Sequence, residues 1–321
     1  TYSDWLLNLL PHNSQYHEGK AGFYDINVLL SHQFSPKDNL YISGYYSHDR
    51  FNFLENEKYE YANANASLQW AHLFGENFRM TTTAGYDHYG YATKNWQKEY
   101  SAYRMGYDIN QYYLKMDFDH DRLENHRIDW GWKAMMYDIN PGDVKPHGTQ
   151  SLYMPKTLEK EQALEAALYL NEEWDITPQL TTSMGMRYSL FNAFGPRTIH
   201  TYREGELPSM LNVTGTETRD GSLKTWHGPE FRLGLRYAFT DNLSVKAGFN
   251  TMRQYIHKIS NTLVMSPTDT WKLSDIFIKP QTGVQYSLGL YQNLMDRQLE
   301  ISIEGYFKTM NNYLDYRSGA Q

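Results

Sequence analysis

The densest group of potential metal ligands in the sequence comprises Asp117, Asp119, His120 and Asp121. Carboxylate and imidazole groups bind Zn²⁺ and related ions, so these residues could in principle form a metal site. They lie at a predicted turn, however, where contact with water is the simpler explanation for charged side chains. The other histidines are scattered along the chain. We therefore predict no metal site.

Sequence signatures of catalysis are absent. The chain has no His-Glu-x-x-His motif, no Gly-x-Ser-x-Gly nucleophile elbow and no glycine-rich phosphate-binding loop. It also has no cysteine, which argues against a thiolate metal site and against a disulfide-stabilised secreted domain. A net charge of −7, spread along the chain, argues against a nucleic-acid partner. We predict no catalytic residues, no cofactor and no enzymatic activity.

Two other groups of residues could contact a ligand. The first consists of charged residues on predicted strands, which alternate with apolar residues and therefore lie on the opposite face. There they could meet water, dock another segment or contact a solute, and the first two explanations are the simpler ones. This group is Arg187, Arg232, Arg236, Lys246, Glu300 and Glu304.

The second group consists of aromatic residues in predicted long loops. Aromatic rings can stack on sugars or other planar ligands, although they also pack against one another within loops. The candidate ligand contacts of this kind are Trp96, Tyr153, Tyr202, Trp226 and Trp271.

The elements that would position these residues are clearest in the stretch from Gly228 to Asn250. Every second residue from Phe231 to Phe239 is apolar, and the same period resumes at Leu243 after a short polar turn. This pattern predicts a β-hairpin with one apolar and one polar face. A hairpin of a soluble β-sandwich would show the same pattern, so the rest of the chain has to decide between the two.

Short turns alternate with long loops along the whole chain. The predicted strands are therefore joined by short turns at one end and by long loops at the other. This is typical of an antiparallel up-and-down outer-membrane β-barrel, in which the short turns lie in the periplasm. The long loops cover roughly 50–60, 90–103, 139–160, 191–227 and 257–279. The predicted strands are 22–34, 40–49, 61–73, 78–89, 104–120, 127–138, 161–173, 179–190, 228–239, 243–256, 280–293 and 298–310.

The composition fits a barrel better than it fits membrane helices. Mean hydropathy is −0.70, and no apolar run approaches the ~18 residues that a membrane helix needs. In a barrel only alternate residues meet lipid, so a polar average is compatible with a membrane location. Aromatic residues, among them Phe74, Phe78 and Trp174, flank the short turns, where barrels carry an interfacial belt.

One segment has the composition of a helix. Leu158 to Trp174 is rich in Ala, Leu and Glu, which favour helices by intrinsic propensity. The tight turn after it leads into another period-two run, so we predict a strand here as well. Its outward residues would be Leu164, Ala166, Leu168 and Leu170.

Several stretches resemble TonB-dependent outer-membrane receptors. Ile278 to Leu290 resembles a strand of that family that carries a Lys-Pro-Glu sequence, with Gln281 in place of the usual Glu. Leu299 to Lys308 and the loop from Met310 to Tyr316 are similar to the next strand and loop of that family. Other stretches resemble a branch with an N-terminal carboxypeptidase-regulatory-like domain before the plug. They are Thr1 to Leu7, Phe23 to Asn27 and Ser266 to Asp275.

The resemblance implies a 22-stranded barrel that is occluded by an N-terminal plug. Residues 1–321 would form about strands four to fifteen of it, an all-β internal segment of about twelve antiparallel transmembrane strands. The sequence starts without an initiator Met or a secretory signal. We therefore expect a partial barrel domain whose plug and terminal strands lie outside the chain.

The function implied by the resemblance is TonB-dependent active transport of a scarce nutrient across the outer membrane of a Gram-negative bacterium. Relatives carry iron chelates, cobalamin, glycans or peptides. The expected partners are outer-membrane lipid, the TonB complex through N-terminal parts missing here, a small nutrient and a surface lipoprotein. Two alternatives stay open: a passive channel made of a complete twelve-stranded barrel, and a barrel-embedded lipase-like enzyme, for which no Ser-His pair is convincingly placed.

Overall fold

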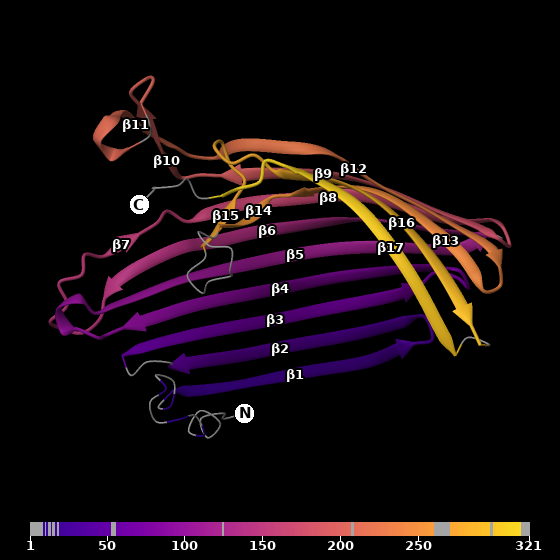
Figure 1. Cartoon of the computed structure of the whole chain (residues 1–321), viewed down its shortest axis with the longest axis horizontal. Coiled ribbons are helices and arrows are strands. Elements are labelled where there is room, and N and C mark those ends of the chain that lie inside the picture. Colours follow the sequence, from indigo (N-terminus) through magenta and orange to yellow (C-terminus); the bar gives the residue numbers. More distant parts are fainter. Residues whose placement is uncertain are drawn as a thin grey trace.

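The chain forms one large curved antiparallel sheet (Figure 1). A computed structural model describes residues 9, 11, 14, 17, 19–52, 56–123, 125–206, 209–259, 270–295 and 298–315. Long strands follow one another in sequence order, and each pairs with the one before and the one after it. They are β1 (Lys20–Ser35), β2 (Asp38–Asn52), β3 (Glu57–Leu73), β4 (Phe78–Asn95), β5 (Tyr103–Leu123), β6 (His126–Pro146), β8 (Glu161–Thr177), β9 (Leu180–Phe194), β12 (Ser222–Thr240), β13 (Leu243–Gln254), β16 (Gln281–Leu294) and β17 (Leu299–Asn311).

All twelve predicted strands are confirmed, and most are longer than predicted. β5 and β6 have 21 residues each, about twice the 9–11 residues with which a barrel strand crosses a bilayer. Asp121 therefore lies within β5 and not in the turn predicted for it. The ladder between the two strands continues to the pair Leu123 and His126, so the strands extend into the predicted turn.

Apolar side chains cover one face of the sheet, which we call the outer face. Leu233 in β12, Phe249 in β13 and Tyr286 in β16 stand opposite one another in the ladder. The ring centres of Phe249 and Tyr286 are 5.2 Å apart. Leu288 is 61% exposed although it lies mid-strand. A soluble monomer rarely exposes so large an apolar surface, whereas a barrel presents one to lipid.

The segment with helical composition is a strand, as predicted. In β8, Leu168 is 67% exposed on the outer face, whereas Ala163 and Ala167 are buried on the opposite, inner face. β8 pairs along its length with β6 and with β9. Two complete ladders and the period-two apolar pattern outweigh the small helical preference of Ala, Leu and Glu.

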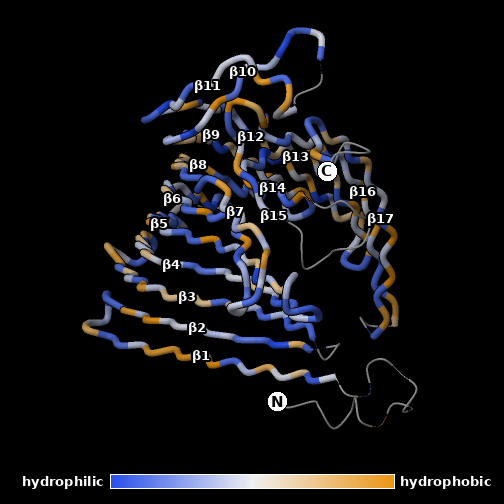
Figure 2. Tube along the Cα trace, turned by 90° about the vertical axis from the view of Figure 1, so that its left-hand side faces the viewer, coloured by the Kyte–Doolittle hydropathy of each residue, from blue (hydrophilic) through white to orange (hydrophobic). Residues whose placement is uncertain are grey.

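Two small hairpins and several short elements lie in the long connections. The projecting hairpin, β10 (Arg197–Tyr202) and β11 (Val213–Arg219), extends beyond the ends of the main strands (Figures 1 and 2). The inner hairpin, β14 (Ile256–Ile259) and β15 (Thr270–Leu273), lies inside the curve of the sheet (Figure 2), where β15 contacts β6 and β8. The short elements are β7 (Lys156–Thr157), η1 (Glu99–Ser101) and η2 (Met210–Asn212).

The buried core sits where the inner hairpin meets the inner face. Phe191 in β9 is fully buried, and its ring stacks on Tyr255 with centres 4.7 Å apart and planes 4° apart. Ile139, Ala163 and Leu273 belong to the same buried cluster. The core is therefore local to the long-loop end of β5, β6, β8 and β9.

The sheet has two open edges. Within the described residues, β1 pairs only with β2 and β17 pairs only with β16, so no ladder joins the first strand to the last. Among the same residues, no helix has the length and apolar character needed to cross a bilayer.

Candidate functional site

Arg187 organises the charges at the centre of the inner face. It lies in β9, and its guanidinium pairs with Glu165 of β8 at 2.9 Å and with Glu230 of β12 at 3.5 Å. The Tyr137 hydroxyl also donates to Glu165, at 2.8 Å. The Ser189 hydroxyl donates to Glu230 at 3.0 Å. Arg187, which was predicted to face the interior, thus holds three adjacent strands together by ion pairs on the inner face.

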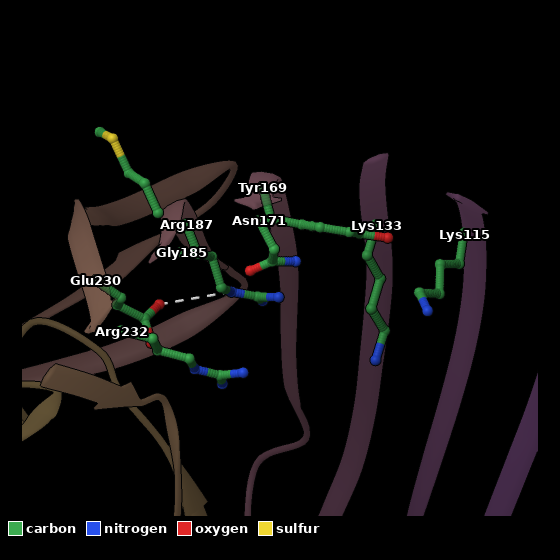
Figure 3. A pocket seen from close by; sticks show the side chains of 9 residues that line it. Lys115, Lys133, Tyr169, Asn171, Gly185, Arg187, Glu230 and Arg232 are labelled. Carbon is green, nitrogen blue, oxygen red and sulfur yellow. Dashed lines mark ion pairs between the residues drawn. The ribbon is translucent and has the colours of Figure 1, made fainter. Parts of the chain in front are cut away.

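A pocket opens beside this network (Figure 3). Its volume is about 220 Å³, and its wall is formed by neighbouring strands from β5 to β12. In Figure 3 the side chains of Lys115, Lys133, Arg187 and Arg232 reach into one space from separate strands. The full lining is Lys115, Lys133, Tyr169, Asn171, Gly185, Met186, Arg187, Glu230 and Arg232.

The remaining predicted charges lie further along the same sheet. Arg236 in β12 and Lys246 in β13 stand opposite each other. The Lys246 ammonium lies 4.3 Å from the centre of the Tyr291 ring, and the Tyr291 hydroxyl donates to Glu304 at 2.7 Å. The structure thus brings Lys246 and Glu304 together through Tyr291. Glu300 lies in β17 as well, nearer than Glu304 to the turn that precedes this strand.

Three of the five predicted aromatic contacts lie in strands, and two of these three pack against the buried core. Trp226 belongs to β12 and Trp271 to β15, and both rings pack against the buried cluster. The Trp226 indole N–H donates to the carbonyl of Asp275 at 3.1 Å. The predicted loop 191–227 ends too late, because β12 begins at Ser222, whereas the predicted loop 257–279 contains all of the inner hairpin except Ile256.

The other three aromatic residues lie in or beside the long connections. The ring of Trp96 is 6.2 Å from that of His147, and the ring of Tyr153 is 5.1 Å from that of Tyr103. Tyr202 is the last residue of β10, and its ring centre lies 6.3 Å from that of His200. The long-loop end therefore carries separate aromatic pairs and not one aromatic platform.

A second cavity, of about 540 Å³, is lined by residues of β2 to β6 and was not predicted from the sequence. Tyr61, Tyr91 and Tyr107 form a row along its wall, with neighbouring ring centres 5.2 Å apart. Glu60 and Asp108 also line it. A signal was present, because Tyr61 and Tyr91 each follow another tyrosine at a spacing of two.

The inner hairpin is clamped to the wall by buried charges. Glu161, the first residue of β8, accepts the backbone N–H of Leu273 at 2.8 Å and pairs with Lys272. Arg197 bridges this carboxylate, at 3.5 Å, to that of Asp275, at 3.7 Å. The 257–279 connection, predicted to be an exterior loop, is therefore packed against the inner face in the part that the structure describes.

His257 of β14 is buried within this clamp. Its Nε2 lies 2.8 Å from the Ser274 hydroxyl, and its Nδ1 has no hydrogen-bond partner in the described part of the chain. Burial lowers the pKa of His257 to about 4, although the Asp275 carboxylate acts in the opposite direction. The imidazole is therefore neutral at neutral pH and fills the interface as an uncharged group.

The residues considered as metal ligands have other partners. Asp117 pairs with Lys115 at 2.9 Å and accepts from Tyr169, and Asp119 pairs with Arg79 at 3.1 Å. The Asp121 side chain is outside the described part. Across the residues that the structure describes, no group of three or more His, Asp or Glu side chains could hold a metal ion.

Known structures of similar fold include those of a copper transporter, an import receptor and a hemophore receptor. The chain superposes on the copper transporter OprC with a TM-score of 0.68 at 10% identity, covering 92% of this chain and 46% of that one. On the ferric-catecholate import receptor Fiu from E. coli, in its closed form, it superposes with a TM-score of 0.63 at 10% identity, covering 97% of this chain and 54% of that one. A third structure is a double mutant of the Serratia marcescens hemophore receptor HasR in complex with its hemophore HasA and heme. Its TM-score is 0.60 at 12% identity, and the match covers 92% of this chain and 46% of that one.

These likenesses, at 10–12% identity, show the fold alone, and the chain spans about half the length of the solved receptors that it matches. None of the curated proteins compared with the chain matches it. The branch with a carboxypeptidase-regulatory-like domain stays a prediction, and Thr1 to Leu7 and Ser266 to Asp269, on which it partly rests, lie outside the described residues. The profile of the TonB dependent receptor-like β-barrel matches residues 1–321. The chain therefore belongs to the TonB dependent receptor-like β-barrel family.

Proposed function

We propose that this chain is the barrel portion of a transporter that imports a scarce nutrient across the outer membrane of a Gram-negative bacterium, driven by the TonB complex. The observation that carries the proposal is the family match over all 321 residues. The two-faced sheet supports it, because apolar side chains cover the outer face whereas charged side chains gather on the inner face.

The intact barrel that we propose has 22 strands and a plug in its interior. The open edges at β1 and β17 support further strands on both sides, because an unpaired edge in lipid would leave backbone groups without partners. Lipid would contact the outer face. The inner face, with its ion pairs around Arg187, would contact the plug and water.

Ligand capture would occur at the end of the barrel that carries the long connections. Trp96, Tyr153 and Tyr202 lie there, and we propose them as ligand contacts. Trp226 and Trp271 are more firmly committed to the chain's own core, so their role would be to support the inner hairpin. HasR was solved with a protein bound, and a surface lipoprotein is the protein partner that we propose for this chain.

A growth experiment tests the proposal. The gene for the intact protein is deleted in its own host, and growth is measured with one limiting nutrient at a time: a ferric siderophore, cobalamin, an oligosaccharide or an oligopeptide. We expect the deletion strain to lose growth on one of these classes. Complementation with the intact gene should restore it.

A second strain, which lacks TonB, separates active from passive transport. We expect it to show the same growth defect as the deletion strain on the same nutrient. Undiminished growth without TonB would point to the passive channel instead. Undiminished growth of the deletion strain on all four classes would contradict import of these nutrients by this protein.

A further inference from the structure

The pocket beside Arg187 has more positive than negative side chains in its lining. Lys115, Lys133, Arg187 and Arg232 come from four different strands, and Glu230 is the one carboxylate among the lining residues. Figure 3 shows the guanidinium of Arg232 and the ammonium of Lys133 on either side of Arg187 and Asn171, all reaching into the same space. Four cations brought together this way repel one another unless anions lie between them.

Two of the four cations are already paired. Arg187 pairs with Glu165 and Glu230, at 2.9 and 3.5 Å, and Lys115 pairs with Asp117 at 2.9 Å. With these three carboxylates counted against four cations, one positive charge remains in excess. Glu230 is further occupied, because it also accepts the Ser189 hydroxyl and the backbone N–H of Arg253.

Lys133 and Arg232 are the cations that remain available. Among the described residues, neither has a carboxylate within ion-pair distance. The Lys133 ammonium lies 5.5 Å from the centre of the Tyr113 ring. This neutral ring supplies no anionic acceptor for the three N–H donors of the ammonium group. The Arg232 guanidinium is exposed to the space of the pocket and presents a planar fork of donors, the geometry that matches a carboxylate or phosphate.

The wall between these two residues is shaped by glycines. Gly131 stands opposite Tyr169, and Gly185 stands opposite Asn171, in neighbouring strands. A Cβ atom at Gly131 would overlap the Met116 carbonyl oxygen and the Tyr169 phenol, and one at Gly185 would overlap the Asn171 amide oxygen. The glycines thus let these two polar side chains lie flat along the wall. The space in front of them stays open.

We propose that this pocket binds an oxyanion, a carboxylate or phosphate group, between Arg232 and Lys133. Arg232 donates two hydrogen bonds to the anion, Lys133 supplies a second positive charge, and Arg187 holds the wall in place through its own ion pairs. The anion has two sources: a free solute in the barrel interior, or the carboxylate side chain of a polypeptide segment that lies against this wall. The site is a property of the protein whether or not transport is driven by TonB.

The first experiment measures binding of radiolabelled citrate to the purified intact protein by equilibrium dialysis at low ionic strength. For a free solute we expect a dissociation constant on the order of 1 mM or below. Arg232→Gln and Lys133→Gln should each weaken binding about tenfold or more, since each removes a charge-assisted hydrogen bond. The matched control is Lys246→Gln. It removes an inner-face cation that lies outside this pocket, over Tyr291, and should leave binding unchanged.

The second experiment identifies a polypeptide source. A carbodiimide joins amines to carboxylates that are in contact, and mass spectrometry of the digested intact protein locates the links. Lys94 and Glu60, 3.3 Å apart in neighbouring strands, provide the internal standard. A segment in the pocket predicts a link from Lys133 to a carboxylate outside residues 1–321, and no citrate binding.

Each result decides the proposal. Citrate binding that depends on Arg232 and Lys133 supports a free anion, and a Lys133 link to a residue outside the chain supports a polypeptide carboxylate. The proposal is overturned if the standard link forms while Lys133 has none and citrate does not bind. It is also overturned if both variants bind citrate as the wild type does. Neither readout depends on uptake, so a failure here is distinguishable from a failure of the transport proposal.

Discussion

The two hairpins inserted between the long strands have opposite surroundings. The projecting hairpin lies beyond the sheet, where Glu217 and Arg219 pair with each other at 3.0 Å in water, and within the described residues only its first residue, Arg197, pairs with the charges around the inner hairpin. The inner hairpin packs against the wall, where Leu273 is 2% and His257 is 1% exposed. Both are short antiparallel pairs in long connections. Their location therefore depends on how much apolar surface each hairpin can bury and on which polar partners the inner face of the sheet provides.

The wall offers the inner hairpin specific partners. Glu161 satisfies the backbone N–H of Leu273 and the charge of Lys272, while Leu273 and Trp271 contribute apolar area to the buried cluster. Burial of apolar area stabilises the contact between the hairpin and the sheet. The buried polar groups are paired, so the contact does not carry the cost of unsatisfied hydrogen bonds. The comparison teaches that a long connection in this fold becomes part of the interior when one buried carboxylate and a few apolar residues anchor it.

The largest expected effect comes from Glu161→Ala. Removal of this carboxylate leaves Lys272 without its anion and leaves Arg197 with Glu159 and Asp275, and loss of one partner of a buried pair costs roughly 3–5 kcal/mol. We expect the inner hairpin to detach. Hydrogen exchange of the Leu273 region, measured by mass spectrometry on the intact protein, should rise towards the rate of the projecting hairpin.

The matched control for that variant is Glu217→Ala on the projecting hairpin. Within the described part of the chain, Glu217 pairs only with the exposed Arg219, so its loss should leave exchange of both hairpins within error. A slow exchange of the Leu273 region in Glu161→Ala, equal to that of the wild type, would show that the carboxylate is not the anchor.

A smaller effect is expected from Leu273→Ala. The side chain is almost fully buried, and truncation of a buried leucine costs about 2–5 kcal/mol. Ile199→Ala, in the half-buried β10, is the comparison and should cost about 1 kcal/mol or less. Exchange rates of the two hairpin peptides report both changes. Equal effects of the two variants would remove the distinction between the hairpins.

The smallest effect is a pH dependence of the inner hairpin. Burial lowers the pKa of His257 from 6.5 to about 4, so the detached hairpin binds a proton more readily than the docked one between these values. Docking is therefore at full strength above about pH 6.5 and weakens as the pH falls towards 4.

Hydrogen exchange of the Leu273 region at pH 7.5 and pH 5, corrected for the intrinsic rate, measures this dependence. We expect faster corrected exchange at pH 5 in the wild type. His257→Gln removes the titrating group, so the difference between the two pH values should disappear. The same difference in the variant would assign the pH dependence to another group.

The sequence predicted the strands well because the sheet is specified locally. Alternation of apolar and polar residues marks each strand, and even the segment from Leu158 to Trp174 followed that pattern against its helical propensity. The face of each charged residue follows from the same period. Arg187 and Arg232 can therefore be assigned to the polar face from the alternation alone.

The anchoring of the inner hairpin could not be predicted because it depends on contacts between distant residues. Glu161 and Leu273 are 112 positions apart, and nothing in either local sequence marks the other as its partner. Trp226 and Trp271 were assigned to loops for the same reason. The strand of Trp226 begins at Ser222, before the predicted strand 228–239, and Trp271 lies in a separate strand of four residues in the inner hairpin. Both are set by pairing and packing and not by a periodic pattern.

The central claim is that the sheet presents one face to lipid and the other to a polar interior, and two adjacent residues of β12 test it most directly. Leu235 lies on the outer face and Arg236 on the inner face. Reversible unfolding of the intact protein in lipid should show that Leu235→Arg lowers the free energy of unfolding by roughly 2–4 kcal/mol, the cost of an arginine facing the bilayer. Arg236→Leu should change it little. Equal losses, or a larger loss for Arg236→Leu, would contradict the assignment of the two faces.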